Sequence, residues 1–387
     1  MKGDKRQVNT YNQQFYCHTA ILHHCDTLLV FFNFSILKMP CIFATSDKPF
    51  NCSNPFLNTM ISRRLLRVKI LQILFAYYKS ENESLSNVEN ELLRSIRKAY
   101  ELYHYLLLLP IELVDFAEGK VQLAKQKLVP THEDLNPNTK FIDNAFVKLI
   151  RDNEALIEYV EKQKIGWGQY PEIIRNLYQK ISISDYFQAY MDSDSSSIND
   201  DKQLIINIIS KELEDFDELY QFLEEQSIYW NDDLEFMLSM VVKTLKKFCE
   251  GQPTGTPLFP MYRSDDDEDY IKRLLRKVIQ YHEENVKLIE EYTKNWEVDR
   301  IASMDILIME LALTEIKEFP SIPIKVSFNE YIEIAKYYST DQSSTFINGV
   351  LDKIIQTLRK KNLVAKQGRG LIGEEDDRLV ISDDEIE

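Results

Sequence analysis

The scarcity of residues that break helices constrains this chain more than any other feature. Its 387 residues include only 10 glycines and 12 prolines. Between them, apolar residues recur at the three- and four-residue spacing of amphipathic helices. With 44% hydrophobic residues, a chain of this length can bury a substantial core. We therefore predict an all-α protein of two or three domains.

The sequence contains no combination of residues that requires an enzyme. The spacing G-x-x-x-x-G-K-[ST] of a P-loop does not occur, nor do H-E-x-x-H, G-x-S-x-G or C-x-x-C. His104, His132 and His282 lie far apart on separate predicted helices, where solvated or hydrogen-bonded histidines are commoner than catalytic bases. We expect a non-catalytic protein without a cofactor or a metal.

Residues 1–59 differ in composition from the rest of the chain. Four of the five cysteines lie there, and the apolar run from Leu28 to Leu37 is too short to span a bilayer. Neither a signal peptide nor an ordered zinc motif fits this segment well. We expect a disordered, non-native extension that precedes a true start at Met60. The cysteine-poor remainder fits a reducing cytoplasm, and we expect no membrane contact.

A basic stretch free of acidic residues follows Met60. It includes Arg63, Arg64, Arg67 and Lys69, whereas the whole chain carries a formal net charge of −16. On a helix the three arginines share one stripe beside apolar residues, and Lys69 points elsewhere. Guanidinium groups bind phosphate through paired hydrogen bonds, so polyanion binding is one interpretation. An ordinary solvated face is the other.

Two helices are expected near the C-terminus. Ser327 and Glu330 have the S-x-x-E spacing of a capping box, which predicts a helix start at Ser327. Apolar spacing continues from Phe346 to Leu358 through Asn348-Gly349, although glycine costs about 1 kcal/mol inside a helix. We expect Gly349 to mark the close approach of another helix or of a ligand.

These segments together resemble the transcription antitermination factor NusB family. The matching residues are Arg63–Leu74, Phe328–Lys336 and Phe346–Asp352, together with a helix from Asp299 to Ile316. Ser86-Asn87-Val88-Glu89, another S-x-x-E box, resembles the start of the second helix. The resemblance implies a NusB-like helical bundle formed by residues 60–119 and 291–363. Residues 120–290 would be a helical insertion of the enlarged form, and 364–387 an acidic disordered tail.

The resemblance also implies a function. NusB-like proteins bind boxA-like single-stranded RNA together with NusE, a small-subunit ribosomal protein, in the transcription elongation complex. The RNA-binding residues carried over from the family are Arg63, Arg64, Arg67, Lys69, Gln72, Phe346 and Asn348. Those for the NusE-type partner are Phe75, Asp305, Glu310 and Glu315. Phe346 could stack on a base or belong to the core, and the carboxylates could attract a basic protein or be simply solvated.

Two other functions stay open at this point. NusB-like domains also precede the catalytic domain of ribosomal RNA cytosine methyltransferases, but nothing after residue 360 could form a cofactor-binding domain with its nucleophilic cysteine. A purely structural helical scaffold is the other alternative.

Overall fold

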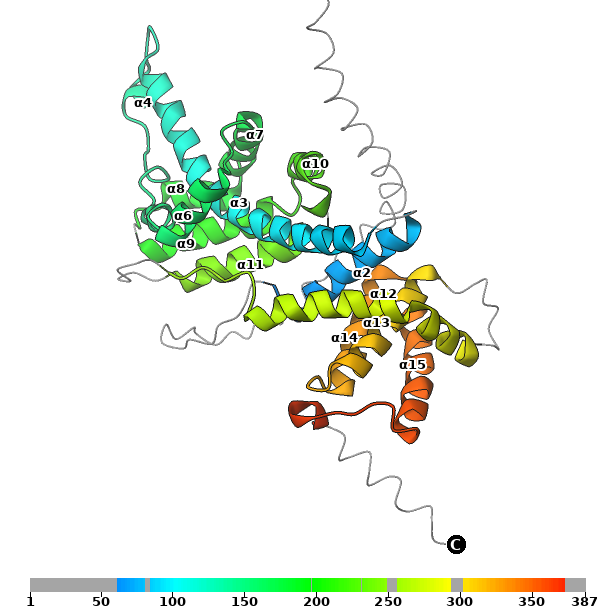
Figure 1. Cartoon of the computed structure of the whole chain (residues 1–387). Coiled ribbons are helices and arrows are strands. Elements are labelled where there is room, and N and C mark those ends of the chain that lie inside the picture. Colours follow the sequence, from blue (N-terminus) through cyan, green and yellow to red (C-terminus); the bar gives the residue numbers. More distant parts are fainter. Residues whose placement is uncertain are drawn as a thin grey trace, which may run out of the picture.

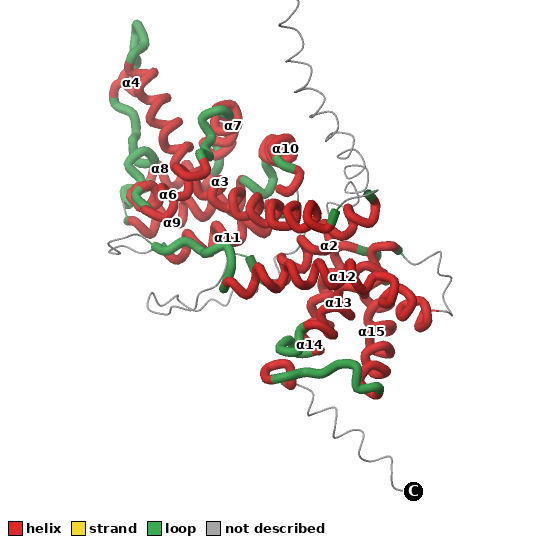
Figure 2. The backbone as a smooth tube through the Cα atoms, viewed as in Figure 1, coloured by secondary structure: helices red, strands yellow, loops and turns green. Residues whose placement is uncertain are grey.

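The computed structural model describes residues 61–80, 84–195, 197–230, 232–248, 256–293 and 302–372. Every regular element within these ranges is a helix, as Figures 1 and 2 show. The prediction of an all-α protein is confirmed. The extension expected at residues 1–59 and Met60 lie outside the described residues.

Helix α2 (Arg63–Lys79) lies at the centre of the molecule. The hydroxyl of Ser62 accepts a hydrogen bond from the backbone N–H of Leu65 and caps the helix. Leu66, Ile70 and Leu74 are completely buried. The helix packs against α3 on one side and against α12 and α13 on the other. Some of its charged residues therefore lie close to side chains of these neighbouring helices.

Helix α3 (Leu85–Lys125) is 41 residues long and connects the helices around α2 with those of the predicted insertion. It packs against α2 and α12, and it also carries α5, α7 and α11 of the predicted insertion (Figure 1). Ser84 caps it, so the predicted capping box at Ser86 was wrong. Glu89 instead forms an ion pair with Arg276 of α12.

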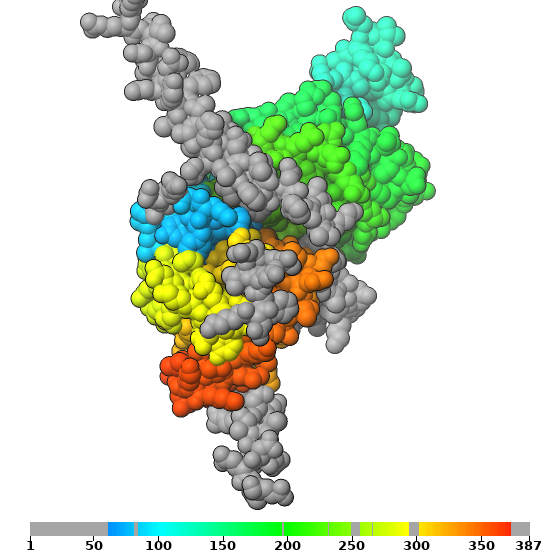
Figure 3. Space-filling model, turned by 90° about the vertical axis from the view of Figure 1, so that its right-hand side faces the viewer, coloured from blue at the N-terminus to red at the C-terminus, as the bar shows by residue number. Residues whose placement is uncertain are grey.

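Four C-terminal helices complete a bundle with α2. They are α12 (Asp265–Thr293), α13 (Ser303–Glu318), α14 (Ile324–Tyr338) and α15 (Ser343–Lys360). Figure 3 shows the blue surface of the α2 region above the yellow of α12, with the orange part beside the yellow and the red part below. The start of α14 was predicted four residues too late: the N-cap is Pro323 instead of Ser327, and the helix begins at Ile324.

The predicted insertion forms a set of shorter helices around α3 and α11. Its elements are α4 (His132–Leu135), α5 (Ala145–Arg151), α6 (Glu154–Gln163), α7 (Pro171–Ser182), α8 (Asp185–Asp192), α9 (Ile198–Asn207), the π-helical turn η1 (Ile208–Glu212), α10 (Asp217–Gln226), the 3₁₀ turn η2 (Ile228–Trp230) and α11 (Leu234–Lys247). Side chains that cap new helices divide the insertion into these short elements. Asn153, for example, accepts from the N–H of Leu156 and begins α6.

The chain after α15 does not leave the fold at residue 364, as the predicted disordered tail required. The buried amine of Lys366 donates to the carbonyls of Ile316 and Phe319 at the end of α13, at 2.9 and 3.0 Å. Such donors satisfy carbonyls that a helix end leaves unpaired. A 3₁₀ turn, η4 (Gly368–Leu371), follows. Residues 373–387 lie outside the described residues.

Residues 368–373 have the spacing G-x-G-x-x-G. A dinucleotide-binding loop places this spacing between a strand and a helix. Here its first four residues form η4, near the end of the described chain. The spacing therefore does not indicate a nucleotide site.

Within the described ranges, no helix is long and apolar enough to cross a membrane. The same residues contain no group of three or more histidine, cysteine, aspartate or glutamate side chains placed to hold a metal ion.

Candidate functional site

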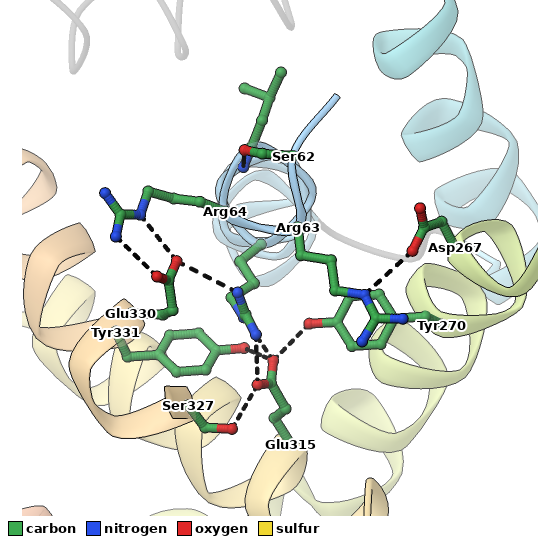
Figure 4. Close-up of polar contacts among 11 residues, drawn as sticks. Ser62, Arg63, Arg64, Asp267, Tyr270, Glu315, Ser327, Glu330 and Tyr331 are labelled. Carbon is green, nitrogen blue, oxygen red and sulfur yellow. Dashed lines mark hydrogen bonds and ion pairs between the residues drawn. The ribbon is translucent and has the colours of Figure 1, made fainter. Parts of the chain in front are cut away.

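The carboxylate of Glu315 on α13 is the centre of a buried polar cluster beneath α2 (Figure 4). Nε and Nη2 of Arg67 donate to its two oxygens at 2.7 and 2.8 Å. Three hydroxyls also donate to it: Tyr270 at 2.5 Å, Ser327 at 2.6 Å and Tyr331 at 3.0 Å. A buried ion pair needs such additional hydrogen bonds to offset its loss of water. Helices α2, α12, α13 and α14 all contribute to this cluster.

Burial alone would raise the pKa of the Glu315 carboxyl. The charge of Arg67, with the hydrogen bonds from Arg67, Ser327 and Tyr270, outweighs burial and holds this pKa below its ordinary value. Glu315 is therefore ionised at neutral pH. Because the side chain of Arg67 is only 3% exposed, its charge is used within the protein.

Arg64 lies one turn away on a more open side of α2. Its Nε and Nη2 donate to the two carboxylate oxygens of Glu330 on α14, at 2.9 and 2.8 Å. Nη1 of Arg67 reaches the same carboxylate at 3.4 Å. The side chain of Arg64 is 39% exposed. Arg64 and Arg67 thus share one carboxylate, and only Arg64 faces solvent.

Arg63 points to the opposite side of α2, toward α12. Its Nε donates to Asp267 at 3.2 Å, and its guanidinium lies 5.0 Å from the centre of the Tyr270 ring. The side chain is 44% exposed. Figure 4 shows Arg63 and Arg64 on either side of the helix, with the buried polar cluster below.

The S-x-x-E spacing of α14 has a different role from the predicted one. Ser327 lies inside the helix and donates to Glu315, and Glu330 binds Arg64 and Arg67. Residues three apart on a helix share a face. The spacing that predicted a helix start therefore positions two side chains toward α2.

The carried-over site is consequently divided. The prediction that all three arginines face outward was wrong for Arg67, because a buried carboxylate far along the chain pairs with it. The carboxylates that hold the arginines lie on α12, α13 and α14. Nothing in the sequence near Arg67 indicated this pairing, since Glu315 is 248 residues away.

Lys69 and Gln72 are engaged by the insertion. The amine of Lys69 is buried and lies 2.7 Å from the carboxylate of Asp233. The amide of Gln72 donates to Asp232 at 2.8 Å. Burial raises the pKa of Asp233, and the nearby Lys69 acts in the opposite direction. The predicted weak RNA contact through Lys69 conflicts with this burial, whereas Gln72 is only half-buried.

Phe346 and Asn348 lie on α15, a helix that packs against α12, α13 and α14. Phe346 is half-buried against the core, so both of its predicted roles stay possible. Asn348 and Gly349 are exposed, and a Cβ added to Gly349 would meet nothing within 4 Å. Among the described residues, no other helix approaches this glycine closely, so that part of the prediction was wrong.

The predicted acidic docking surface is not present at these carboxylates. Asp305 is buried and accepts hydrogen bonds from the hydroxyls of Ser339 and Ser343. Glu310 is also buried and lies 2.9 Å from Nδ1 of His282, and Glu315 holds Arg67. Charges buried in this way cannot form an exposed acidic face. Phe75, by contrast, is half-buried near the surface, with the amine of Lys79 5.7 Å from its ring centre.

The model of the NusB family matches residues 252–356, which include α12. The transcription antitermination protein NusB of Salinibacter ruber is 42% identical over 114 residues, covering 30% of this chain and 71% of the relative. The chain belongs to the NusB family.

Other relatives match over similar lengths. NusB of Chloroherpeton thalassium is 41% identical over 105 residues, covering 27% of this chain and 50% of the relative. NusB of Clostridium botulinum is 44% identical over 91 residues, covering 24% and 64%. The chain thus spans half to two thirds of these two relatives. No solved structure matches it.

Proposed function

We propose that this NusB-family protein is a non-catalytic transcription antitermination factor. It binds boxA-like single-stranded RNA together with a NusE-type small-subunit ribosomal protein, within the transcription elongation complex. The observation that carries the proposal is its 42% identity to a transcription antitermination protein. The two half-exposed arginines at the start of α2 supply the chemistry for RNA.

The exposed arginines retain hydrogen-bonding capacity for phosphate. A guanidinium has five N–H donors, and the bonds from Arg64 to Glu330 use two of them. Arg63 gives one to Asp267. The carboxylates fix each side chain in place, so less conformational entropy is lost when phosphate binds.

Arg67 has a positioning role in this proposal. Its bonds to Glu315 fix the orientation of α2 relative to α13 and α14. Arg64 is held by Glu330 on that same α14. The buried pair thus sets the direction in which the exposed arginine points.

The exposed face of α15 is the second proposed RNA contact. Asn348 offers an amide there, and half-buried Phe346 offers a ring edge or face. Gly349 is exposed without any packing reason for lacking a side chain. A backbone left bare on a helix surface suits a ligand that approaches closely.

The proposal of a NusE-type partner is based on family membership and on the position of Phe75. The buried carboxylates Asp305, Glu310 and Glu315 would influence it only by shaping the helices on which they lie. A half-buried aromatic side chain is a common anchor in protein interfaces. We therefore place the partner contact near Phe75 on α2.

An RNA gel shift with a boxA-like single strand tests the proposal. It is carried out with and without the cognate NusE-type protein, over a range of salt concentrations. We expect weak binding by the chain alone and tighter binding by the pair. The variant Arg63→Gln/Arg64→Gln should lose affinity for RNA. The slope of log K against log salt concentration should become less negative by about 1.4, at roughly 0.7 per phosphate contact.

Arg151→Gln/Arg175→Gln is the matched control. Both of these arginines are partly exposed and ion-paired, like Arg63 and Arg64, but they lie on α5 and α7 of the insertion. The control should bind RNA as the wild type does. Equal losses in the two double variants would contradict the proposed site, and no effect of the partner would contradict the proposed function.

A further inference from the structure

Two arginines near the start of α2 have no ionic partner among the residues that the structure describes. Arg97 on α3 and Arg263 in the loop before α12 are both exposed. In the described part of the chain, neither side chain makes an ion pair or a hydrogen bond. Among the other exposed arginines, Arg151, Arg175 and Arg276 are paired with carboxylates, whereas Arg94 and Arg369 have no ion pair within the described residues. The position of Arg263 and Arg97 relative to Arg63, and not the lack of a partner alone, distinguishes them.

Asp267 places Arg263 beside Arg63. One of its carboxylate oxygens accepts from Nε of Arg63 at 3.2 Å, and the other accepts from the backbone N–H of Arg263 at 3.0 Å. Asp267 is itself buried. Both arginines are thus fixed to the same side chain, one through its guanidinium and the other through its backbone.

The loop before α12 also packs on α3. The hydroxyl of Tyr100 donates to the carbonyl of Phe259 at 3.1 Å. Burial raises the pKa of Tyr262 to about 12, while the nearby charge of Arg97 acts in the opposite direction. Arg97 therefore lies close to the loop that carries Arg263. Tyr262, which precedes Arg263 in the chain, is half-buried and could stack on a base.

We propose that Arg97 and Arg263 extend the RNA-binding surface of α2 across the α12 loop onto α3. This inference rests on the proposed function and adds residues that the family resemblance did not supply. The phosphates of one RNA strand would pass from Arg64 and Arg63 to Arg263 and Arg97. Exposed carboxylates of Asp266 and Asp269 lie on the same helix start and limit the affinity. The unpaired guanidinium groups supply the positive charge that a polyanion requires, and these acids oppose it.

The test compares Arg97→Gln/Arg263→Gln with the wild-type full chain in complex with the NusE-type protein. The probe is a boxA-like single strand, used as such and with added nucleotides at either end. Four arginine contacts give a salt slope of about −2.8, and the variant should show about −1.4. We expect a several-fold or greater loss of affinity, larger for the extended RNA. Arg97→Lys/Arg263→Lys should restore the slope, because lysine keeps the charge.

Three outcomes would overturn the inference. The first is an unchanged slope and affinity for every RNA, with Arg63→Gln/Arg64→Gln still defective; the proposed function would then stand. The second is a loss of binding to the NusE-type protein instead of RNA, which would make this a protein-docking surface. The third is a loss equal to that of Arg151→Gln/Arg175→Gln. If Arg63→Gln/Arg64→Gln also bound RNA as tightly as the wild type, the result would count against the proposed function itself.

Discussion

Replacing Arg67 by methionine distinguishes a structural arginine from one that contacts RNA. The substitution removes the charged guanidinium group and leaves an unbranched apolar side chain in its place. It leaves Glu315 buried beside three hydroxyl donors but without its counter-ion. Removing one partner of a buried ion pair typically costs about 3–5 kcal/mol. We expect Arg67→Met to lower the free energy of unfolding by that amount.

Arg64→Met is the matched control. It breaks an equally well-formed bidentate pair, with Glu330, but one that is partly exposed. Exposed pairs contribute about 1 kcal/mol or less. Urea unfolding followed by circular dichroism measures both changes. The double variant Arg67→Met/Glu315→Gln should lose less than the sum of the single variants, because it leaves no unpaired buried charge.

The pH dependence of stability should change sign at Glu315. In the wild type its pKa lies below the ordinary value of 4.5, so its contribution is present above that value and is lost as the pH falls through the lower folded pKa. In Arg67→Met, burial should raise the pKa of this carboxyl. The deficit should then shrink as the pH falls from neutral toward the ordinary carboxyl range. A loss of 1 kcal/mol or less, together with lost RNA binding in the folded variant, would refute this reasoning.

Three further predictions follow from single sites. Gly349→Ala should stabilise the protein by about 0.5–1 kcal/mol in thermal unfolding, because nothing opposes a Cβ there, and should weaken RNA binding if the strand touches this backbone. Gly370→Ala should destabilise the C-terminal segment, because the new Cβ would lie 1.9 Å from the carbonyl oxygen of Pro320; faster proteolysis after α15 would reveal it. Lys69→Met should cost about 3–5 kcal/mol by leaving Asp233 buried and unpaired, with a smaller deficit at low pH; an unchanged unfolding midpoint would contradict it.

The local sequence was sufficient to predict the helices of the bundle. The motif residues of Arg63–Leu74, Phe328–Lys336 and Phe346–Asp352 resembled the NusB family before any contact was known. The local sequence did not predict the first residue of each helix reliably. Ser327 and Glu330 satisfy the capping-box spacing, but Pro323 begins the helix and their side chains bind other elements.

Charged residues were the hardest to interpret, because their burial depends on distant partners. Arginine and glutamate are almost never fully buried unless paired. An exposed face was therefore the natural prediction for Arg67 and Glu315. These two partners are separated from each other by 248 residues, and no periodic pattern connects them. Lys69 shows the same limitation, since Asp233 belongs to the predicted insertion.

The contacts of the insertion with the bundle bear on how RNA binding is arranged. The segment before α11 binds α2 through Asp232 and Asp233, and the loop before α12 carries Arg263. Helix α11 is therefore flanked by two segments that touch the end of the bundle where we propose that RNA binds. Because α11 packs along α3, a substitution that moves α11 should move both segments together. If Arg263 contacts RNA, the insertion is part of the binding surface, and changes in its core should alter RNA affinity without touching α2.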